Sequence, residues 1–261
     1  MKPENSIELR EKGYTIIRNL IDNELLDSLS NKMDVAFIKH RKTQLSNGND
    51  IETGGVALHV LLDDVVFMNL LKHLQAVGMF KFLKEEFFGG KCIVNSLSAL
   101  DNLPNQPNFS SLVHRDLRFY SGDFPIMVNC LLMVDGFSIE NGGTYLLPGS
   151  HLEERKPTDK EFFKKAIQVV GNRGDIVIFN SNVWHSSAPN TTQNHRRAIP
   201  LTVSRSFMKQ LIDYPRALGY NKMDSFTPQL QQLLGYHSRV PSSLNEWYQP
   251  ENKRFYKKDQ D

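Results

Sequence analysis

The residues with the clearest capacity for chemistry are two histidines and an aspartate that could bind one metal ion. His114 and Asp116 form a His-x-Asp pair, and side chains at positions i and i+2 of a strand point to the same face. Two histidines and one carboxylate on one face of iron(II) leave its other positions open for a co-substrate and oxygen. The second histidine must come from a distant strand, and the candidates in the strand-rich region are His151, His185 and His195.

His-x-Asp alone is a weak signal, but the segments that follow it add to the case. GDIVIFNSNVWHSSAPN places His185 just after a buried strand, Ile176–Phe179. Arg196 and Arg197 then stand at the start of a further apolar strand. A buried guanidinium is costly without an anionic partner. A dicarboxylate co-substrate would supply that partner, because a carboxylate matches the fork of an arginine.

Four stretches, in this order, resemble the phytanoyl-CoA dioxygenase family of 2-oxoglutarate-dependent oxygenases: VHRDL, ENGGTYLLPGSH, GDIVIFNSNVWHSSAPN and RRAIPL. The opening, GYTIIRNLI followed by DNELLDSL, is also similar to that family. The resemblance covers the chain from about residue 8 to residue 206. It implies a mainly β fold with flanking helices, in which the core is a double-stranded β-helix (a cupin-like jelly roll).

The resemblance also implies the residues of the site. In the family, a His-x-Asp pair and a distal histidine bind iron(II), and these residues are here His114, Asp116 and His185. The family's arginine eleven residues after the distal histidine binds the far carboxylate of 2-oxoglutarate, and that position is Arg196. Ser187, two residues after the distal histidine, matches a place where a hydroxyl often assists in binding this co-substrate.

Other polar residues lie near these motifs. Arg118 has the parity of the metal-binding pair, so it could bind an anionic group of the substrate, although a surface or salt-bridged arginine is the more common finding. Arg197 should point to the opposite face of its strand from Arg196 and is expected to be structural. The Pro-Gly-Ser-His turn that ends at His151 is expected to organise a nearby loop, and His195 is expected to face solvent.

Two long polar segments, residues 42–56 and 101–112, are predicted to be loops that could cover the site. His59, Asn95 and Asn129 could line its pocket, although residues of these types are more often structural.

The activity that the resemblance implies is hydroxylation of an unactivated C–H bond in a small metabolite or natural-product intermediate, with release of succinate and CO2. Family members that halogenate lack the carboxylate, so Asp116 favours hydroxylation or a related oxidation. Desaturation, ring closure and epimerisation stay open. The alternatives are a cupin-like metal enzyme that does not use 2-oxoglutarate, a non-catalytic binding protein on the same fold, and a zinc hydrolase.

Composition sets wider limits. The 261 residues suit one domain (1–261), with a helical N-terminal part (about 1–90), a jelly-roll core (about 91–206) and a C-terminal extension (207–261). A net charge of +2 gives no concentrated basic field for nucleic acid. No secretory signal and no apolar run of membrane-spanning length is present, which favours a cytoplasmic protein whose partners are a small-molecule substrate and molecular oxygen. Cys92 and Cys130 are expected to be buried free thiols. The oligomeric state stays open.

Periodicity and turn residues predict the following elements. Helices are expected over residues 5–12, from Asp22 towards residue 41, from 64 to 88 with a break near Gly78, and over 159–166, and one or two short helices are expected after residue 207. Strands are expected at Tyr14–Ile17, Lys91–Leu97, Val113–Phe119, Ile126–Val134, Thr144–Leu147, Ile167–Val170, Ile176–Phe179 and Ala198–Ser206.

Overall fold

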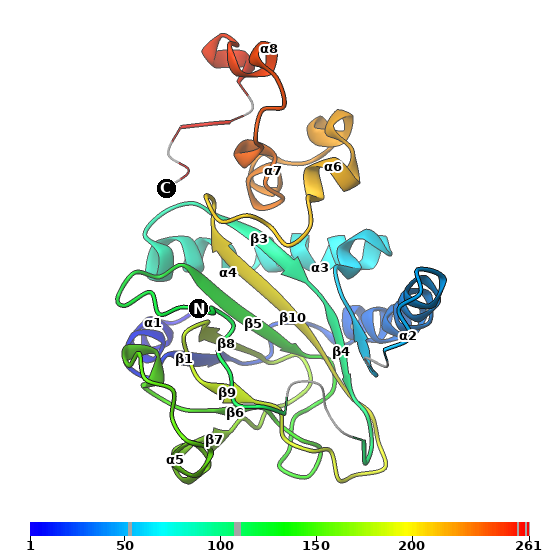
Figure 1. Cartoon of the computed structure of the whole chain (residues 1–261), viewed down its shortest axis with the longest axis vertical. Helices are drawn as coiled ribbons and strands as arrows, with labels where there is room; N and C mark the ends of the chain where they lie inside the picture. The colour runs from blue at the N-terminus through cyan, green and yellow to red at the C-terminus, as the bar shows by residue number, and fades with distance from the viewer. Residues whose placement is uncertain (52–53, 107–110, 255, 259, 261) are drawn as a thin grey trace.

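Two antiparallel sheets form the centre of the protein, and helices cover one face of the larger sheet (Figure 1). The computed structural model describes residues 1–51, 54–106, 111–254, 256–258 and 260. The larger sheet has seven strands in the order β1-β8-β5-β10-β4-β2, and β3 also pairs with β10. The smaller sheet has the order β7-β6-β9. The strand β10 is long enough to pair with β5 on one side and with both β3 and β4 on the other.

The strands are β1 (Tyr14–Ile17), β2 (Val56–Ala57), β3 (Cys92–Leu97), β4 (Ala99–Asn102), β5 (Met127–Met133), β6 (Tyr145–Leu146), β7 (Ile167–Gln168), β8 (Ile176–Asn180), β9 (His185–Ser186) and β10 (Arg196–Arg205). The α-helices are α1 (Pro3–Glu11), α2 (Asn23–Ser46), α3 (Val65–Ala76), α4 (Met79–Phe82), α5 (Asp159–Lys165), α6 (Tyr214–Leu218), α7 (Pro228–Leu233) and α8 (Leu244–Trp247). A π-helical turn, Leu83–Phe88, continues α4.

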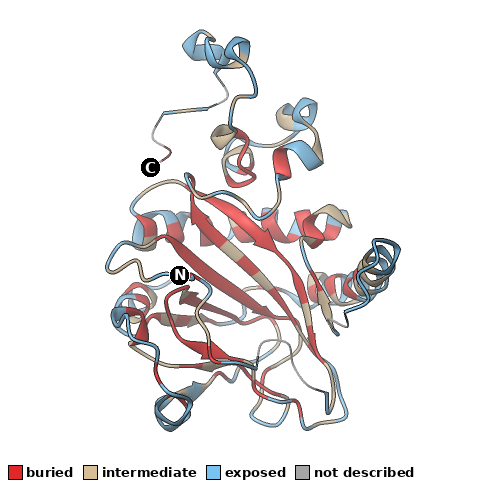
Figure 2. Cartoon of the chain, viewed as in Figure 1, coloured by how far each residue is buried: buried red, intermediate tan, exposed pale blue. Residues whose placement is uncertain are grey.

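The strands β3 and β5 are buried along their whole length, and Figure 2 shows most of the larger sheet in the colour of buried residues. Ile199, Leu201 and Val203 of β10 pack into the cluster that also contains the apolar faces of α2 and α3. Ala198 lies on the other face of β10 and packs against the interior residues of β5 and β8. Alternation along a strand therefore assigns odd-numbered residues of this part of β10 to the helices and even-numbered ones to the interior of the jelly roll.

The turn before β1 is fixed by a close contact. Gly13 has φ +80, and a Cβ at this position would come within 2.4 Å of His151 Nδ1. His151 is buried, and its Nε2 donates to the carbonyl of Arg10 at 2.9 Å. The neighbouring Ser150 hydroxyl accepts from the backbone N–H of Trp184 at 2.9 Å. The predicted organising role of the Pro-Gly-Ser-His turn thus corresponds to contacts with the N-terminal segment and with the residue before His185.

Most predicted elements are present, but one predicted strand is absent. The segment Val113–Phe119 is not a strand, since only His114 forms an isolated β-bridge, with His185. The chain turns after this bridge, because Asp116 and Leu117 both donate their N–H groups to the carbonyl of Ser181. The strand predicted at Tyr14–Ile17 within the helical N-terminal part is present as β1, and it forms an edge of the larger sheet.

Both predicted loops are shorter than expected. The helix α2 continues to Ser46, and β2 and β4 include the ends of the two segments. Residues 52–53 and 107–110 of these candidate lids lie outside the described residues, and a covering role for the loops stays a prediction.

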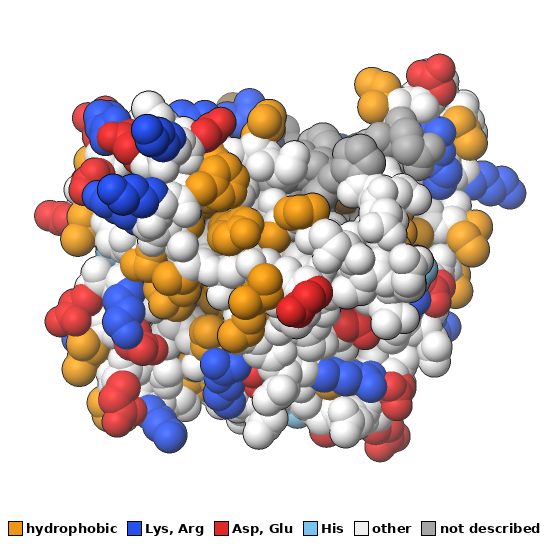
Figure 3. Space-filling view, turned by 90° about the horizontal axis from the view of Figure 1, so that it is seen from below, with side chains coloured by type: hydrophobic (Ala, Val, Ile, Leu, Met, Phe, Trp, Pro, Cys, Tyr) orange, Lys and Arg blue, Asp and Glu red, His pale blue; other side chains and the backbone are white. Residues whose placement is uncertain are grey.

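Both cysteines are buried and free, as predicted. Burial raises the pKa of Cys92 to about 12. On the face in Figure 3, basic and acidic side chains are intermingled around exposed apolar ones. Within the described ranges, no helix combines the length and the apolar character that crossing a membrane requires.

The turn that precedes β8 is stabilised by the buried carboxylate of Asp175. It accepts from Arg18 Nη1 at 2.6 Å and from the backbone N–H groups of Asn19 and Asn172, each at 2.9 Å. Replacing Asp175 with alanine should lower the free energy of unfolding by about 3 kcal/mol, because it leaves several partners of a buried charge unpaired. Urea denaturation measures this, with Asp27→Ala as the control. Asp27 forms one exposed ion pair, so equal losses in the two variants would contradict the prediction.

Candidate iron and 2-oxoglutarate site

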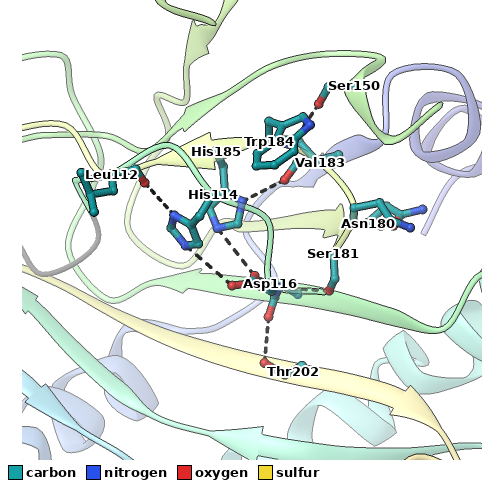
Figure 4. A network of polar contacts seen from close by, with 12 residues as sticks. Leu112, His114, Asp116, Ser150, Asn180, Ser181, Val183, Trp184, His185 and Thr202 are labelled. Atoms are coloured by element: carbon teal, nitrogen blue, oxygen red, sulfur yellow. Dashed lines mark hydrogen bonds and ion pairs between the residues drawn. The ribbon is translucent and has the colours of Figure 1, made fainter. Parts of the chain in front are cut away.

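His114, Asp116 and His185 come together at one point of the jelly roll, although the two histidines are 71 positions apart in the sequence. One ligand atom from each residue lies within 4.8 Å of the others. His114 Nε2 is 3.7 Å from Asp116 Oδ1, and His185 Nε2 is 3.6 Å from Asp116 Oδ2. Figure 4 shows the two imidazoles and the carboxylate turned towards one another. The spacing suits a single metal ion bound by all three side chains.

Backbone hydrogen bonds hold the two ligand-bearing segments side by side. His114 N donates to the carbonyl of His185 at 3.0 Å, and His185 N donates to the carbonyl of His114 at 2.8 Å. The pairing of Leu146 with His185 adds the histidine to the smaller sheet. The bridge therefore places a residue of an irregular segment beside β9, which brings the two imidazoles to a centroid separation of 4.2 Å.

The tautomer of each imidazole is fixed by the hydrogen bond that its Nδ1 makes with a backbone carbonyl. His114 Nδ1 lies 2.7 Å from the carbonyl oxygen of Leu112, and His185 Nδ1 lies 2.9 Å from that of Val183 (Figure 4). A carbonyl oxygen can only accept, so each Nδ1 carries the hydrogen and each neutral ring keeps the Nε2 lone pair free. Histidines that bind metals in proteins are oriented in this way. The donor set therefore fits a divalent iron ion.

Burial differs among the three residues. The side chains of His114 and Asp116 are 36% and 33% exposed, whereas that of His185 is 9% exposed. Burial lowers the pKa of His185, while the nearby Asp116 carboxylate acts in the opposite direction. The lowered pKa favours the neutral imidazole, which is the form that binds metal. The exposed side of His114 and Asp116 leaves a path from solvent to the site.

Arg196 is buried on the interior face of β10, with an exposure of only 3%. Its Nη2 donates to the carbonyl of Gly142 at 3.1 Å, and its guanidinium lies 4.4 Å from the ring centroid of Phe137. Within the described parts of the chain it forms no ion pair, and its Nε has no hydrogen-bond partner. Burial lowers its pKa to about 10, so the group is still a cation at neutral pH. The carboxylates of Asp101 and Asp135 favour the charged form without an ion-pair contact, so this buried cation fits an anionic ligand.

Arg197 points to the opposite face, as its parity predicted. It contacts α2 through an ion pair with Asp34 at 3.2 Å and a hydrogen bond to Ser30. Its backbone N–H donates to Asp135 at 2.8 Å. Arg197 therefore has acidic partners within the protein, whereas Arg196 has a free guanidinium edge on the interior face.

Comparison with known proteins identifies the family. The family model described as phytanoyl-CoA dioxygenase (PhyH) matches residues 9–198, which is more than half of the chain. The chain belongs to the phytanoyl-CoA dioxygenase family. The resemblance inferred from the sequence motifs is thus confirmed, and with it the dioxygenase class of the enzyme.

Relatives and a solved structure agree with the family assignment. The chain is 37% identical to the uncharacterized protein Rv1501 of Mycobacterium tuberculosis, over 95% of this chain and 92% of the relative. It is 24% identical to the iron/alpha-ketoglutarate-dependent dioxygenase penM of Penicillium thymicola, over 90% and 78% of the two chains. The epimerase SnoN, crystallised with Fe3+, alpha-ketoglutarate and nogalamycin RO, has a similar fold with a TM-score of 0.58 at 15% identity, over 78% and 83% of the chains. The predicted cupin-like fold class is confirmed.

The remaining predicted residues of this dioxygenase are placed as follows. Ser187 lies half-buried just after β9. Arg118 is exposed, and its role in binding an anionic substrate group stays a prediction. Asn95 bonds to Ser204 Oγ at 3.3 Å and to the carbonyl of Lys209 at 3.1 Å, which favours a structural role.

Two histidines have no polar contact with the three metal-binding candidates in the described ranges. His59 is half-buried between β2 and α3, with a left-handed φ of 60, and burial lowers its pKa. The side chain of His195 is half-exposed, in accord with the predicted solvent-facing position, but it also pairs with Asp101 at 2.6 Å.

Asn129 was expected only as a possible residue of the pocket, and the polar contacts around the metal-binding candidates were not predicted. Asn129 donates to Asp116 Oδ2 and to Ser181 Oγ, and Thr202 donates to Asn129. The signal available for Asn129 was a single amide within the apolar run Ile126–Val134. Arg115, at the centre of the His-x-Asp motif, stacks over the ring of Trp184 with 4.2 Å between the guanidinium carbon and the ring centroid. This stack joins the two ligand-bearing segments a second time, and no spacing rule predicts it.

Proposed function

We propose that this enzyme is an iron(II)- and 2-oxoglutarate-dependent oxygenase that hydroxylates an unactivated C–H bond of a small metabolite or natural-product intermediate, with release of succinate and CO2. The observation that carries the proposal is the combination of three converging candidate ligands with a buried arginine that makes no ion-pair contact in the described ranges and whose Nε has no hydrogen-bond partner. The name of the penM relative, an iron/alpha-ketoglutarate-dependent dioxygenase, supports the same cofactors.

In this proposal, His114, Asp116 and His185 hold iron(II), which together with 2-oxoglutarate supplies the oxidative chemistry. The backbone carbonyls of Leu112 and Val183 keep both imidazoles in the tautomer that presents Nε2 to the metal. These three residues would be the only protein ligands from the described residues, so the bound ion would also take small ligands such as the co-substrate.

Arg196 binds the distal carboxylate of 2-oxoglutarate in a charge-assisted contact. It lies on the same face of β10 as Thr202, whose hydroxyl bonds to Asn129 beside Asp116. Its surroundings are apolar on the side of Phe137, so the contact forms in a poorly solvated place where such pairs are strong. Ser187 adds a hydroxyl near the same co-substrate, and Arg118 binds an anionic group of the substrate if one is present.

A metal enzyme that does not use 2-oxoglutarate is less well supported. In the part of the chain that the structure describes, no further histidine, cysteine or acidic residue joins the group of three. A cupin-like enzyme of another class would use a fourth such ligand, and it would give the buried Arg196 no anion to bind. The site also differs from that of halogenating members of the family, because they lack the carboxylate that Asp116 supplies here.

The decisive experiment needs no knowledge of the substrate. Metal-free protein is titrated anaerobically with iron(II) and then with 2-oxoglutarate, and the visible metal-to-ligand charge-transfer band is recorded. We expect a saturable band at about one equivalent of iron(II), because the structure offers one set of ligands. Iron binding without a band would contradict the proposed co-substrate, and failure to bind iron would contradict the metal site itself.

A further inference from the structure

The carboxylate of Asp116 is held by a network of side chains from three other segments. Asn129 of β5 donates one amide hydrogen to Asp116 Oδ2 and the other to Ser181 Oγ at 3.1 Å. Thr202 of β10 donates its hydroxyl hydrogen to Asn129 Oδ1 at 2.7 Å. Figure 4 shows Thr202 and Ser181 on either side of the aspartate. Every polar atom of the Asn129 amide therefore has a partner.

The network fixes which end of the amide faces the carboxylate. Because an ionised carboxylate can only accept, the amide nitrogen must face Asp116, and Asn129 Oδ1 then faces the Thr202 hydroxyl, which donates to it. With the amide reversed, its oxygen would face a carboxylate oxygen, and two acceptors would meet without a hydrogen between them. Thr202 and Asn129 are cross-strand partners in the register of β10 and β5, so the contact is set by the sheet and does not depend on a loop.

The position of Asn129 is unusual for its strand. The seven residues of β5 are all buried, and Asn129 is the one amide among apolar neighbours and a cysteine. A buried amide is tolerated only where its hydrogen bonds are made. Here those bonds lead to a residue that the proposed function assigns to the metal. The cost of burying the amide is therefore offset by contacts that orient Asp116.

We infer that Asn129, aligned by Thr202, is a positioning residue that holds Oδ2 of Asp116 and so presents Oδ1 to the metal. This inference rests on the proposed function, in which Asp116 binds iron. An amide donor on Oδ2 favours ligation through one oxygen, and Oδ1 would be the oxygen that binds iron(II). Outer contacts of this kind orient metal ligands and tune metal affinity in other proteins.

The test compares metal affinity in four variants. Asn129→Ala removes the amide, and Thr202→Val removes only the hydroxyl that aligns it. The double variant measures whether the two act as one unit. Asn95→Ala is the matched control, since Asn95 is a similarly buried amide on neighbouring β3 whose bonds go to Ser204 and Lys209.

Affinity of the metal-free proteins is measured with iron(II) alone under anaerobic conditions, and folding is checked by thermal unfolding without metal. We expect Asn129→Ala to weaken iron(II) binding about 10–100-fold and Thr202→Val less, since loss of an outer partner of a metal ligand has this size of effect. The double variant should match Asn129→Ala, because Thr202 acts only through the amide. Asn95→Ala should keep the affinity of the original protein.

Two controls separate the possible failures. If the original protein does not bind iron(II), the proposed function is contradicted, and the inference that rests on it is contradicted as well. If it does bind iron(II), an unchanged affinity in Asn129→Ala overturns the inference alone. Additive losses in the double variant, or an equal loss in Asn95→Ala, would also overturn it, because they would show independent contacts or general destabilisation.

Discussion

Replacing Asp116 or His185 with alanine is expected to abolish both turnover and stoichiometric iron(II) binding. Each residue supplies one of three protein ligands, and the remaining two cannot hold the ion firmly. Loss of an outer partner of a metal ligand already costs about 10–100-fold in affinity, so loss of the ligand itself should cost at least about 100-fold. Anaerobic titration with iron(II) measures the affinity, and the charge-transfer band with 2-oxoglutarate should be absent.

The control for this experiment is His151→Ala. His151 is as buried as His185, but its ring bonds to the carbonyl of Arg10 and lies against Gly13. This variant should lose thermal stability and keep its iron affinity. An Asp116→Ala protein with undiminished iron binding would remove the aspartate from the ligand set and would also remove the basis for a role of Asn129.

Replacing Arg196 with glutamine is expected to weaken 2-oxoglutarate binding while leaving iron(II) binding nearly unchanged. The guanidinium is buried, carries its charge at neutral pH and has no acidic partner in ion-pair contact among the described residues. Removing one member of a buried charge pair costs roughly 2–5 kcal/mol, which corresponds to at least about a 30-fold loss of affinity. Titration of the iron(II)-loaded protein with 2-oxoglutarate measures this through the charge-transfer band.

The neighbouring arginine provides the matched control. Arg197→Gln removes the same type of side chain from the next position, but the group it removes is paired with Asp34 and Ser30 on α2. It should lower stability and leave the affinity for 2-oxoglutarate intact. If Arg197→Gln weakened 2-oxoglutarate binding and Arg196→Gln did not, the assignment of the two arginines would be reversed. Arg196→Lys should be intermediate, since it keeps the charge and loses the fork.

The two arginines differ in the face of β10 on which their side chains lie. Both stand at the start of the same strand, and the family resemblance assigns a role to only one. The structure gives a physical reason for that choice, since an even-numbered position of β10 faces the interior and an odd-numbered one faces α2. A cation without an acidic partner is costly in the interior, and it becomes favourable when a carboxylate ligand occupies the place beside it.

The main residues of the candidate site could be predicted from the sequence. His114, Asp116, His185 and Arg196 were proposed from residue types, spacing and the order of four short motifs. The same motifs predicted the fold class, and apolar runs predicted β1, β5, β8 and nearly all of β10. These features are local in the chain, because the pattern of consecutive residues predicts a strand or a turn.

The tertiary structure decided how the candidates are held together. The expected strand Val113–Phe119 is replaced by a single bridge to His185 and a turn towards Ser181, since the ligand-bearing segment takes its hydrogen bonds from residues far along the chain. The contacts of Asn129 with Thr202 and Asp116, and of Arg115 with Trp184, likewise join segments that are distant in sequence. Such contacts depend on strand register and on the packing of side chains between strands. Neither can be predicted from the spacing of residues within one motif.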